Sequence, residues 1–158
     1  MIFFEAPPPM SVEEFMSSAQ EVLSGGELKP LEELVNNTPS SHPFVVAWRN
    51  YDTQLRNAIA RARATRLGVD SAAYLRAPAE SDFWAERKIA MVFEESDPLK
   101  REDVIERLRF EKARELAGLE PLTLNTLLAY LVQLQIVSRR ALRDTERGHE
   151  RRDKLTTI

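Results

Sequence analysis

Apolar residues recur along this chain at the three- and four-residue spacing of amphipathic helices, and no alternating apolar run is long enough to predict a strand. Helix start and stop signals divide the pattern. The capping box Ser11-Val12-Glu13-Glu14 predicts a first helix over residues 12–23 that stops at Gly25-Gly26, and a short second helix is expected over residues 30–36. The predicted fold is therefore all-α: a multi-helix bundle of about five to seven helices, with more than about 60% of the residues helical.

The longest amphipathic pattern lies between Ser41, the expected N-cap, and Gly68, the expected stop. At about 100° per residue its apolar positions form one stripe, with Tyr51 at the margin, and this stripe is predicted to be buried. The stripe consists of Phe44, Trp48, Leu55, Ile59 and Ala62. A row of arginines lies beside it, where their stems can cover apolar surface while the guanidinium groups face outward. The row consists of Arg49, Arg56 and Arg63.

The same signals place the later helices. A small helix is expected from Asp70 to Leu75, and a helix over residues 82–94 is expected to start at Ser81. The next helix is expected to begin at Asp97-Pro98 and end at Gly118, and the last one to begin at Pro121 and Thr123. From Leu127 to Val137 nearly every residue is apolar, so the last helix is expected to be the central one, with Leu128 and Leu131 buried. Gln135 falls among these leucines. Its amide is predicted to be buried and hydrogen-bonded, either to a neighbouring helix or as a contact for another subunit.

The two ends of the chain are expected to differ from this pattern. Residues 1–10 form an irregular, Pro-rich entry, and residues 147–158 form a charged tail that frays around Gly148. The chain is predicted to be a single helical domain over residues 1–158. Its N-terminus does not have the pattern of a signal peptide, and its longest apolar run would span about 16 Å against the roughly 30 Å of a bilayer core.

Composition and charge narrow the class of protein. The absence of cysteine excludes thiol nucleophiles, zinc–thiolate sites and disulfide frameworks, and it suits a reducing compartment. Arginine outnumbers lysine, a bias that either favours paired contacts with carboxylates or phosphates or reflects only the base composition of a GC-rich genome. Residues 1–40 hold seven Glu and one Lys, whereas residues 49–66 hold five Arg and one Asp. Two surfaces of opposite sign are therefore expected.

No catalytic constellation is visible. His42 and His149 lie about a hundred residues apart without metal-ligand spacing, and neither phosphate-binding glycine motif occurs. Adjacent carboxylates such as Glu13-Glu14 point about 100° apart on a helix, unlike an acid–base pair. The chain is therefore predicted to be no enzyme, with no metal and no cofactor. Nucleic-acid binding is disfavoured because the chain is acidic and its aromatic residues fall on the buried stripe.

Three segments carry a resemblance to a known family. They are Trp48-Arg49-Asn50-Tyr51 with Leu55-Arg56-Asn57 and Ala60-Arg61-Ala62-Arg63-Ala64; Asp97-Pro98-Leu99-Lys100-Arg101-Glu102; and Leu127-Leu128-Ala129-Tyr130-Leu131 with Leu134-Gln135-Ile136 and Arg139. In this order they resemble a bacterial family of unassigned function that is encoded beside V/A-type rotary ATPases. That family is similar to the central-stalk component known as C in bacteria and archaea and as d in eukaryotes. The resemblance covers residues 11–155; of the family's Tyr-rich N-terminal segment, only Ile2-Phe3-Phe4 and the prolines are present.

The resemblance implies a fold like part of this C/d stalk component and a non-catalytic adaptor or accessory subunit that links the central stalk to the membrane rotor ring. Carboxylates on stalk and ring subunits would then pair with outward-facing arginines, unless the acidic first helix satisfies them internally. The expected partner-binding residues are Arg49, Arg56, Arg63, Arg139 and Arg140. The expected location is cytoplasmic, or peripheral on the inner face of the cell membrane through protein partners. The alternative is a free-standing helical regulator that binds nucleic acid or a small ligand.

Overall fold

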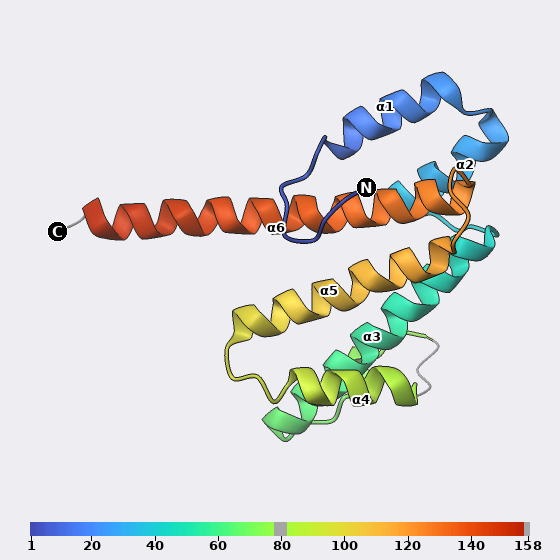
Figure 1. The fold of residues 1–158 in the computed structure, drawn as a ribbon. Coiled ribbons are helices and arrows are strands. Elements are labelled where there is room, and N and C mark those ends of the chain that lie inside the picture. Colours follow the sequence, from blue (N-terminus) through green and yellow to red (C-terminus); the bar gives the residue numbers. More distant parts are fainter. Residues whose placement is uncertain (78–81, 157–158) are drawn as a thin grey trace. The chain divides into compact units, whose positions relative to one another are not determined.

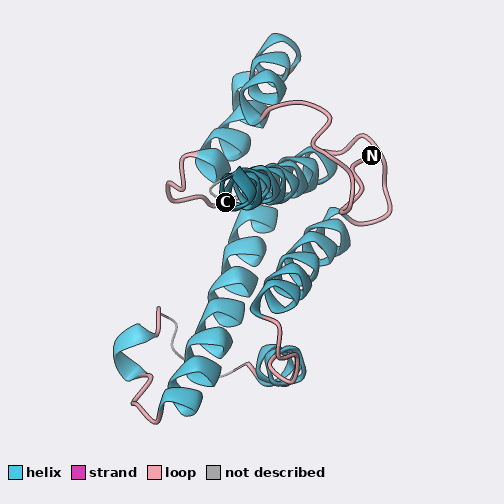
Figure 2. Cartoon of the chain, turned by 90° about the vertical axis from the view of Figure 1, so that its left-hand side faces the viewer, coloured by secondary structure: helices cyan, strands magenta, loops and turns pink. Residues whose placement is uncertain are grey.

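The chain is described by a computed structural model over residues 1–77 and 82–156, with side chains described as far as Asp144 (Figure 1). All regular structure in these ranges is helical, and Figure 2 shows helices joined by loops without a strand. The elements are α1 (Val12–Val22), α2 (Gly25–Val35), α3 (Pro43–Leu67), the 3₁₀ turn η1 (Ala72–Tyr74), α4 (Phe83–Val92), α5 (Pro98–Ala117) and α6 (Leu124–Thr156). The predicted all-α multi-helix fold and its high helix content are confirmed.

The chain divides into two compact units. Met1–Ser40 and Ala113–Ile158 form the terminal unit, which contains α1, α2 and α6. Ser41–Lys112 form the central unit, which contains α3, η1, α4 and most of α5. The single helical domain expected over residues 1–158 stays a prediction.

Helix α6 is the core element of the terminal unit. Both α1 and α2 pack against it (Figure 1), and Leu128 and Leu131 are fully buried. Phe15 of α1 stacks on Tyr130 of α6 with ring centroids 5.3 Å apart. The backbone of α6 continues as helix through Thr156, past the fraying expected near Gly148, while the side chains of the charged tail lie outside the described residues. No described helix combines the length and apolar character needed to cross a bilayer.

The structure places Gln135 at a less buried position of α6 than expected, and the predicted hydrogen bond of its amide stays a prediction. Gln135 is only partly buried, Leu142 on the same side of α6 is exposed, and the buried glutamine is Gln133. The difference in burial between Gln133 and Gln135 has a physical cause. Because almost every residue from Leu127 to Val137 is apolar, a helical wheel hardly favours one direction over another for the buried face.

The boundary between the first two helices also differs from the prediction. The capping box at Ser11 forms, with the N–H of Glu14 donating to the Ser11 hydroxyl and the N–H of Ser11 to the Glu14 carboxylate. Gly25-Gly26, however, does not serve as a stop but begins α2. The carboxylate of Glu27 accepts hydrogen bonds from the hydroxyl and the N–H of Ser24, and these bonds lower the pKa of Glu27. The spacing Ser24 to Glu27 is itself a capping-box signal, so the predicted start near Pro30 was wrong.

Helix α3 organises the central unit and ends as predicted at Gly68, which adopts a left-handed conformation. Its N-cap is His42 rather than Ser41. Of the predicted stripe, Phe44, Leu55 and Ile59 are buried, whereas the other two members and the marginal tyrosine are partly buried: Trp48, Ala62 and Tyr51. Leu55, Ala58 and Ile59 pack with Ala85, Ile89, Val92 and Phe93 from the α4 region and with Ile105 of α5. This cluster is the hydrophobic core of the unit.

Of the other predicted caps, Asp97 agrees with the structure, whereas the expected helix from Asp70 to Leu75 is the short turn η1, whose N-cap is Ser71. The Asp70 carboxylate accepts from the N–H of Ala72 at η1, and the Asp97 carboxylate accepts from the N–H of Leu99 in α5. At α4 the capping side chain is that of Asp82, and the expected start at Ser81 lies outside the described residues. These local caps set the ends of the helices that surround the pocket described below.

Candidate functional site: an arginine pocket in the central unit

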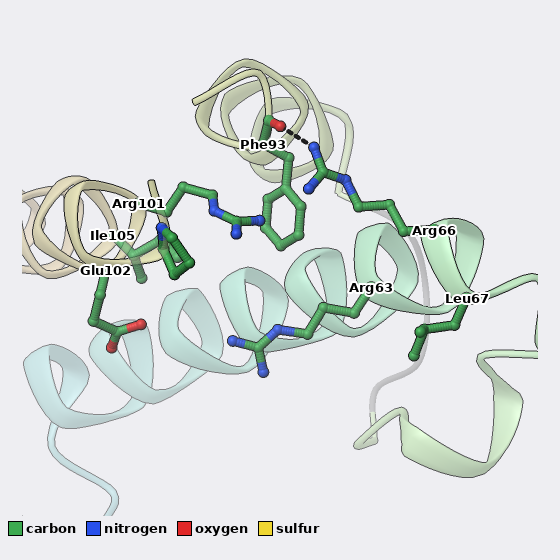
Figure 3. A pocket seen from close by; sticks show the side chains of 8 residues that line it. Arg63, Arg66, Leu67, Phe93, Arg101, Glu102 and Ile105 are labelled. Atoms are coloured by element: carbon green, nitrogen blue, oxygen red, sulfur yellow. Dashed lines mark hydrogen bonds between the residues drawn. The ribbon is translucent and has the colours of Figure 1, made fainter. Parts of the chain in front are cut away.

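A pocket of 320 Å³ lies among α3, the end of α4 and the start of α5 (Figure 3). It is lined by Arg63, Arg66, Leu67, Phe93, Pro98, Arg101, Glu102 and Ile105. Three guanidinium groups thus surround a space whose lining contains one carboxylate. We call this space the arginine pocket.

Phe93 organises two of the three arginines. Its ring is buried, and the guanidinium carbons of Arg66 and Arg101 lie 5.1 and 5.2 Å from the ring centroid. Arg66 also donates a hydrogen bond to the carbonyl oxygen of Phe93 (Figure 3). Cation–π contacts of this kind attract each cation to the ring, so both arginines are positioned by Phe93.

The third arginine, Arg63, makes no cation–π contact with Phe93. Its side chain is exposed and makes no hydrogen bond or ion pair with other residues in the part of the chain that the structure describes. Figure 3 shows its side chain extending along α3 beside the pocket that it lines. In addition, the Nε of Arg101 is buried without a hydrogen-bond partner among the described residues. A buried donor without a partner is costly, so the pocket has donors to offer an incoming acceptor.

These features define what the pocket can do chemically. Guanidinium groups present forked donors that match the two oxygens of a carboxylate or of a phosphate. Besides the carboxylate of Glu102, the lining holds no hydroxyl, thiol, amine or imidazole that could act as a nucleophile or a proton shuttle. Across the described residues no group of three His, Cys, Asp or Glu could hold a metal ion. The arrangement is therefore suited to binding an anion.

The structure brings only Arg63 of the predicted row to the pocket. The Nε of Arg56 instead donates to Asp52 Oδ2 at 2.6 Å, one turn earlier on the same helix, and Arg49 also interacts within the chain. The acidic first helix was considered as an internal partner for this row, but the carboxylate paired with Arg56 belongs to α3. Arg66 and Arg101 were not predicted as site residues, because only the packing of α3 with α4 and α5 brings them together.

Asp52 is the centre of an ion-pair network within the central unit. The Nε of Arg109 donates to Asp52 Oδ1 at 2.8 Å, and its Nη1 donates to Glu106 Oε1 at 2.9 Å. Burial raises the pKa of Asp52, but the charges of Arg109 and Arg56 outweigh burial and hold that pKa below its usual value. Burial lowers the pKa of Arg109, and Asp52 and Glu106 outweigh it and raise the pKa. The network fixes α5 to α3.

The two arginines predicted on the last helix have different surroundings. Arg140 Nη1 donates to the carbonyl oxygen of Phe4 at 2.6 Å, and its guanidinium carbon lies 4.3 Å from the centroid of the Phe4 ring. Phe4 itself is buried. Arg139 is exposed and also interacts within the chain. Arg140 therefore holds the N-terminal segment in the terminal unit.

Replacing Arg140 by Met is expected to lower the free energy of unfolding by about 1–2 kcal/mol, because a charge-assisted hydrogen bond and a cation–π contact are lost while the apolar stem is kept. Urea unfolding measures the change, and limited proteolysis should cut the N-terminal segment faster. The matched control is Arg139→Met on the exposed side of α6. Equal effects of the two substitutions would contradict the role given to Arg140.

The fold and the pocket define a small all-helical protein with an arginine-lined binding space. Residues 80–156 of the chain match a family model described as a protein of unknown function (DUF2764). The match covers just under half of the chain and includes Phe93 and Arg101 but not α3, which supplies Arg63. No curated protein and no solved structure matches the chain.

Proposed function

We propose that this chain is a non-catalytic adaptor or accessory subunit of a V/A-type rotary ATPase that links the central stalk to the membrane rotor ring. The observation that carries the proposal is the composition of the arginine pocket. Arg63 belongs to the first of the three segments that resemble the ATPase-associated family, and Arg101 and Glu102 belong to the second. Two segments that carry the resemblance therefore meet at one site that is suited to anions.

In this role the pocket receives an Asp or Glu carboxylate from a helix of a stalk or ring subunit. Arg66 and Arg101 are already positioned by Phe93, so they lose less side-chain freedom on binding than free arginines would. Arg63, which also lines the pocket, can close on the same carboxylate. The chain would lie in the cytoplasm, peripheral to the membrane through its protein partners.

The double substitution Arg63→Gln with Arg101→Gln tests this function. It is expected to weaken binding to the purified stalk and ring subunits by about tenfold or more, because a carboxylate would be left without its charged partners. The melting temperature should fall only modestly, since Arg63 is exposed without an ion-pair partner in the described ranges, and Arg101 loses one cation–π contact with Phe93. Binding is measured by titration calorimetry and by co-purification with a tagged stalk subunit.

Arg56→Gln is the matched control, because Arg56 lies on the same helix but outside the pocket. It should leave assembly unchanged. Equal weakening by Arg56→Gln and by the pocket variant would show that net charge rather than the pocket matters. Unchanged assembly in the pocket variant would remove these arginines from the site.

One observation favours the alternative of a free-standing regulator. The volume of 320 Å³ falls at the lower end of the roughly 300–1,000 Å³ found for small-molecule sites, so a small anion could occupy the pocket. Titration of the isolated chain with inorganic phosphate and with succinate distinguishes the two functions. Saturable binding that is lost in the pocket variant, without co-purification of stalk proteins, would favour the regulator.

A further inference from the structure

The side of α4 that faces away from the core carries large apolar residues exposed to solvent. Phe83 and Trp84 are each 66% exposed and Met91 is 64% exposed. Arg87 and Lys88 are exposed between them, and at about 100° per residue all five side chains fall within an arc of about 140°. We call these five residues the α4 outer face.

This face lies opposite the buried side of the same helix. Ala85, Ile89 and Val92 pack into the core cluster against α3, and Figure 1 shows α4 lying against the C-terminal half of α3. The helix is therefore anchored by its inner side and does not need its outer aromatic residues for packing. The rings of Phe83 and Trp84 meet edge to face, with centroids 5.5 Å apart, and so form one apolar projection.

The charge of the α4 outer face has one sign. Both ionisable residues within the arc are cations, and the acidic residue of α4, Glu86, lies on the flank, where Arg61 pairs with it. Glu94 follows only after the helix has ended. The face therefore complements a surface that is apolar inside and negatively charged at its rim.

We infer that the α4 outer face docks on an anionic lipid surface, with the two rings and Met91 entering the headgroup–acyl boundary and the two cations meeting lipid phosphates. Aromatic rims flanked by Arg and Lys are the pattern of interfacial helices, which immerse by about 5–10 Å. Size also favours a lipid surface over a protein partner. Two-thirds-exposed aromatic side chains offer on the order of 200–300 Å² together, whereas a specific protein interface needs about 800 Å² on each side.

Vesicle co-sedimentation of the full chain tests the inference, which does not depend on the rotary ATPase role. Binding to phosphatidylcholine vesicles containing one quarter phosphatidylglycerol should be about twentyfold stronger than to phosphatidylcholine alone, since each cation near an anionic surface contributes about fivefold. Phe83→Ser with Trp84→Ser should weaken binding to the anionic vesicles at least tenfold. Arg87→Gln with Lys88→Gln should remove the preference for anionic lipid.

Matched controls use exposed residues elsewhere on the chain. Leu119→Ser and Lys100→Gln with Arg114→Gln should leave vesicle binding unchanged. A quencher attached to the lipid chains should quench the fluorescence of the wild type, and Trp84→Phe should abolish the quenching while binding persists, because Trp48 is then the remaining tryptophan.

Three results would overturn the inference: no binding to anionic vesicles at low salt, equal binding to neutral and anionic vesicles, or equal effects of the control and α4 substitutions. Concentration-dependent self-association that is lost in the Phe83 and Trp84 variant, in the absence of vesicle binding, would assign the face to a second copy of this chain instead. None of these results bears on the stalk-binding test of the arginine pocket, so failure of one proposal leaves the other to be judged separately.

Discussion

Replacing Asp52 by Asn is expected to lower the free energy of unfolding by about 2–3 kcal/mol at neutral pH, which corresponds to a melting temperature lower by roughly 4–12 °C. The substitution keeps the shape of the side chain but removes the charge that Arg109 faces. The side chain of Arg109 is only 12% exposed, so the guanidinium cannot recover its hydration. Glu106 still accepts one of its hydrogen bonds, which keeps the cost below that of a fully unpaired buried charge.

Arg56→Gln provides the matched comparison for the same carboxylate. Arg56 also pairs with Asp52, but its side chain is 47% exposed, and an exposed pair of this kind contributes at most about 1 kcal/mol. A double-mutant cycle of Asp52→Asn with Arg109→Met should therefore give a larger coupling energy than the cycle with Arg56→Gln. Equal couplings would show that burial of Arg109 does not matter for stability.

The effect of Asp52→Asn should depend on pH. Because the folded-state pKa of Asp52 lies below its unfolded value of about 3.9, the carboxylate stabilises the fold above about pH 4, and this stabilisation is lost as the pH falls through the folded-state pKa. The difference between the wild type and Asp52→Asn should thus be full at pH 6–7 and shrink toward pH 3. Urea unfolding across this range measures it, and a difference that is constant with pH would contradict the assigned ion pair.

Local signals in the sequence predict this fold well. The capping box at Ser11, the cap at Asp97 and the left-handed end at Gly68 each depend on residues close to a helix end. The start of α2, which was predicted at the wrong residue, also depends on a local signal. Ser24 and Glu27 have the spacing of a capping box, but the two glycines between them were interpreted as a helix stop.

Features that depend on the packing of distant residues could not be predicted in this way. Arg63 was identified from its place in the arginine row, yet Arg101, which lines the same pocket, comes from α5 and is brought there only by the packing of the helices. Likewise, Asp52 and Arg109 are 57 residues apart in the chain. A helical wheel gives the direction of one face of one helix, and it contains no information about which arginine of another helix that face meets.

The buried position of Asn57 could not be predicted either, because a helical wheel that marks only apolar residues leaves out a buried polar residue of α3. It is fully buried, and its amide makes two hydrogen bonds with the backbone of Arg76: Nδ2 donates to the carbonyl oxygen at 2.9 Å, and the Arg76 N–H donates to Oδ1 at 2.9 Å. The Asn57 side chain thus both donates to and accepts from the backbone of one residue in the segment that follows η1. It therefore fixes the backbone at Arg76 to α3.

Asn57→Ala is expected to lower the free energy of unfolding by about 2–3 kcal/mol, because two hydrogen bonds are lost and a small cavity forms in a fully buried position. Asn50→Ala, at an exposed position of the same helix, should be neutral or slightly stabilising, since Ala has the higher helix propensity. Urea unfolding of both variants measures the contrast. Similar effects at the two positions would contradict the role of the Asn57 amide.

Asn57→Asp separates the hydrogen bonds from the size of the side chain. The carboxylate has almost the same shape and still accepts from the N–H of Arg76, but in its charged form it cannot donate to the carbonyl oxygen and would repel it. Burial beside that carbonyl should raise the pKa of the new carboxyl in the folded state, so the variant should be at least as unstable as Asn57→Ala at pH 7. Its deficit relative to the wild type should decrease as the pH falls toward 4, because the protonated carboxyl can donate again. A deficit that does not change between pH 7 and pH 4 would show that the pKa of the new carboxyl is not raised in the folded state, and would contradict the expected repulsion by the carbonyl oxygen of Arg76.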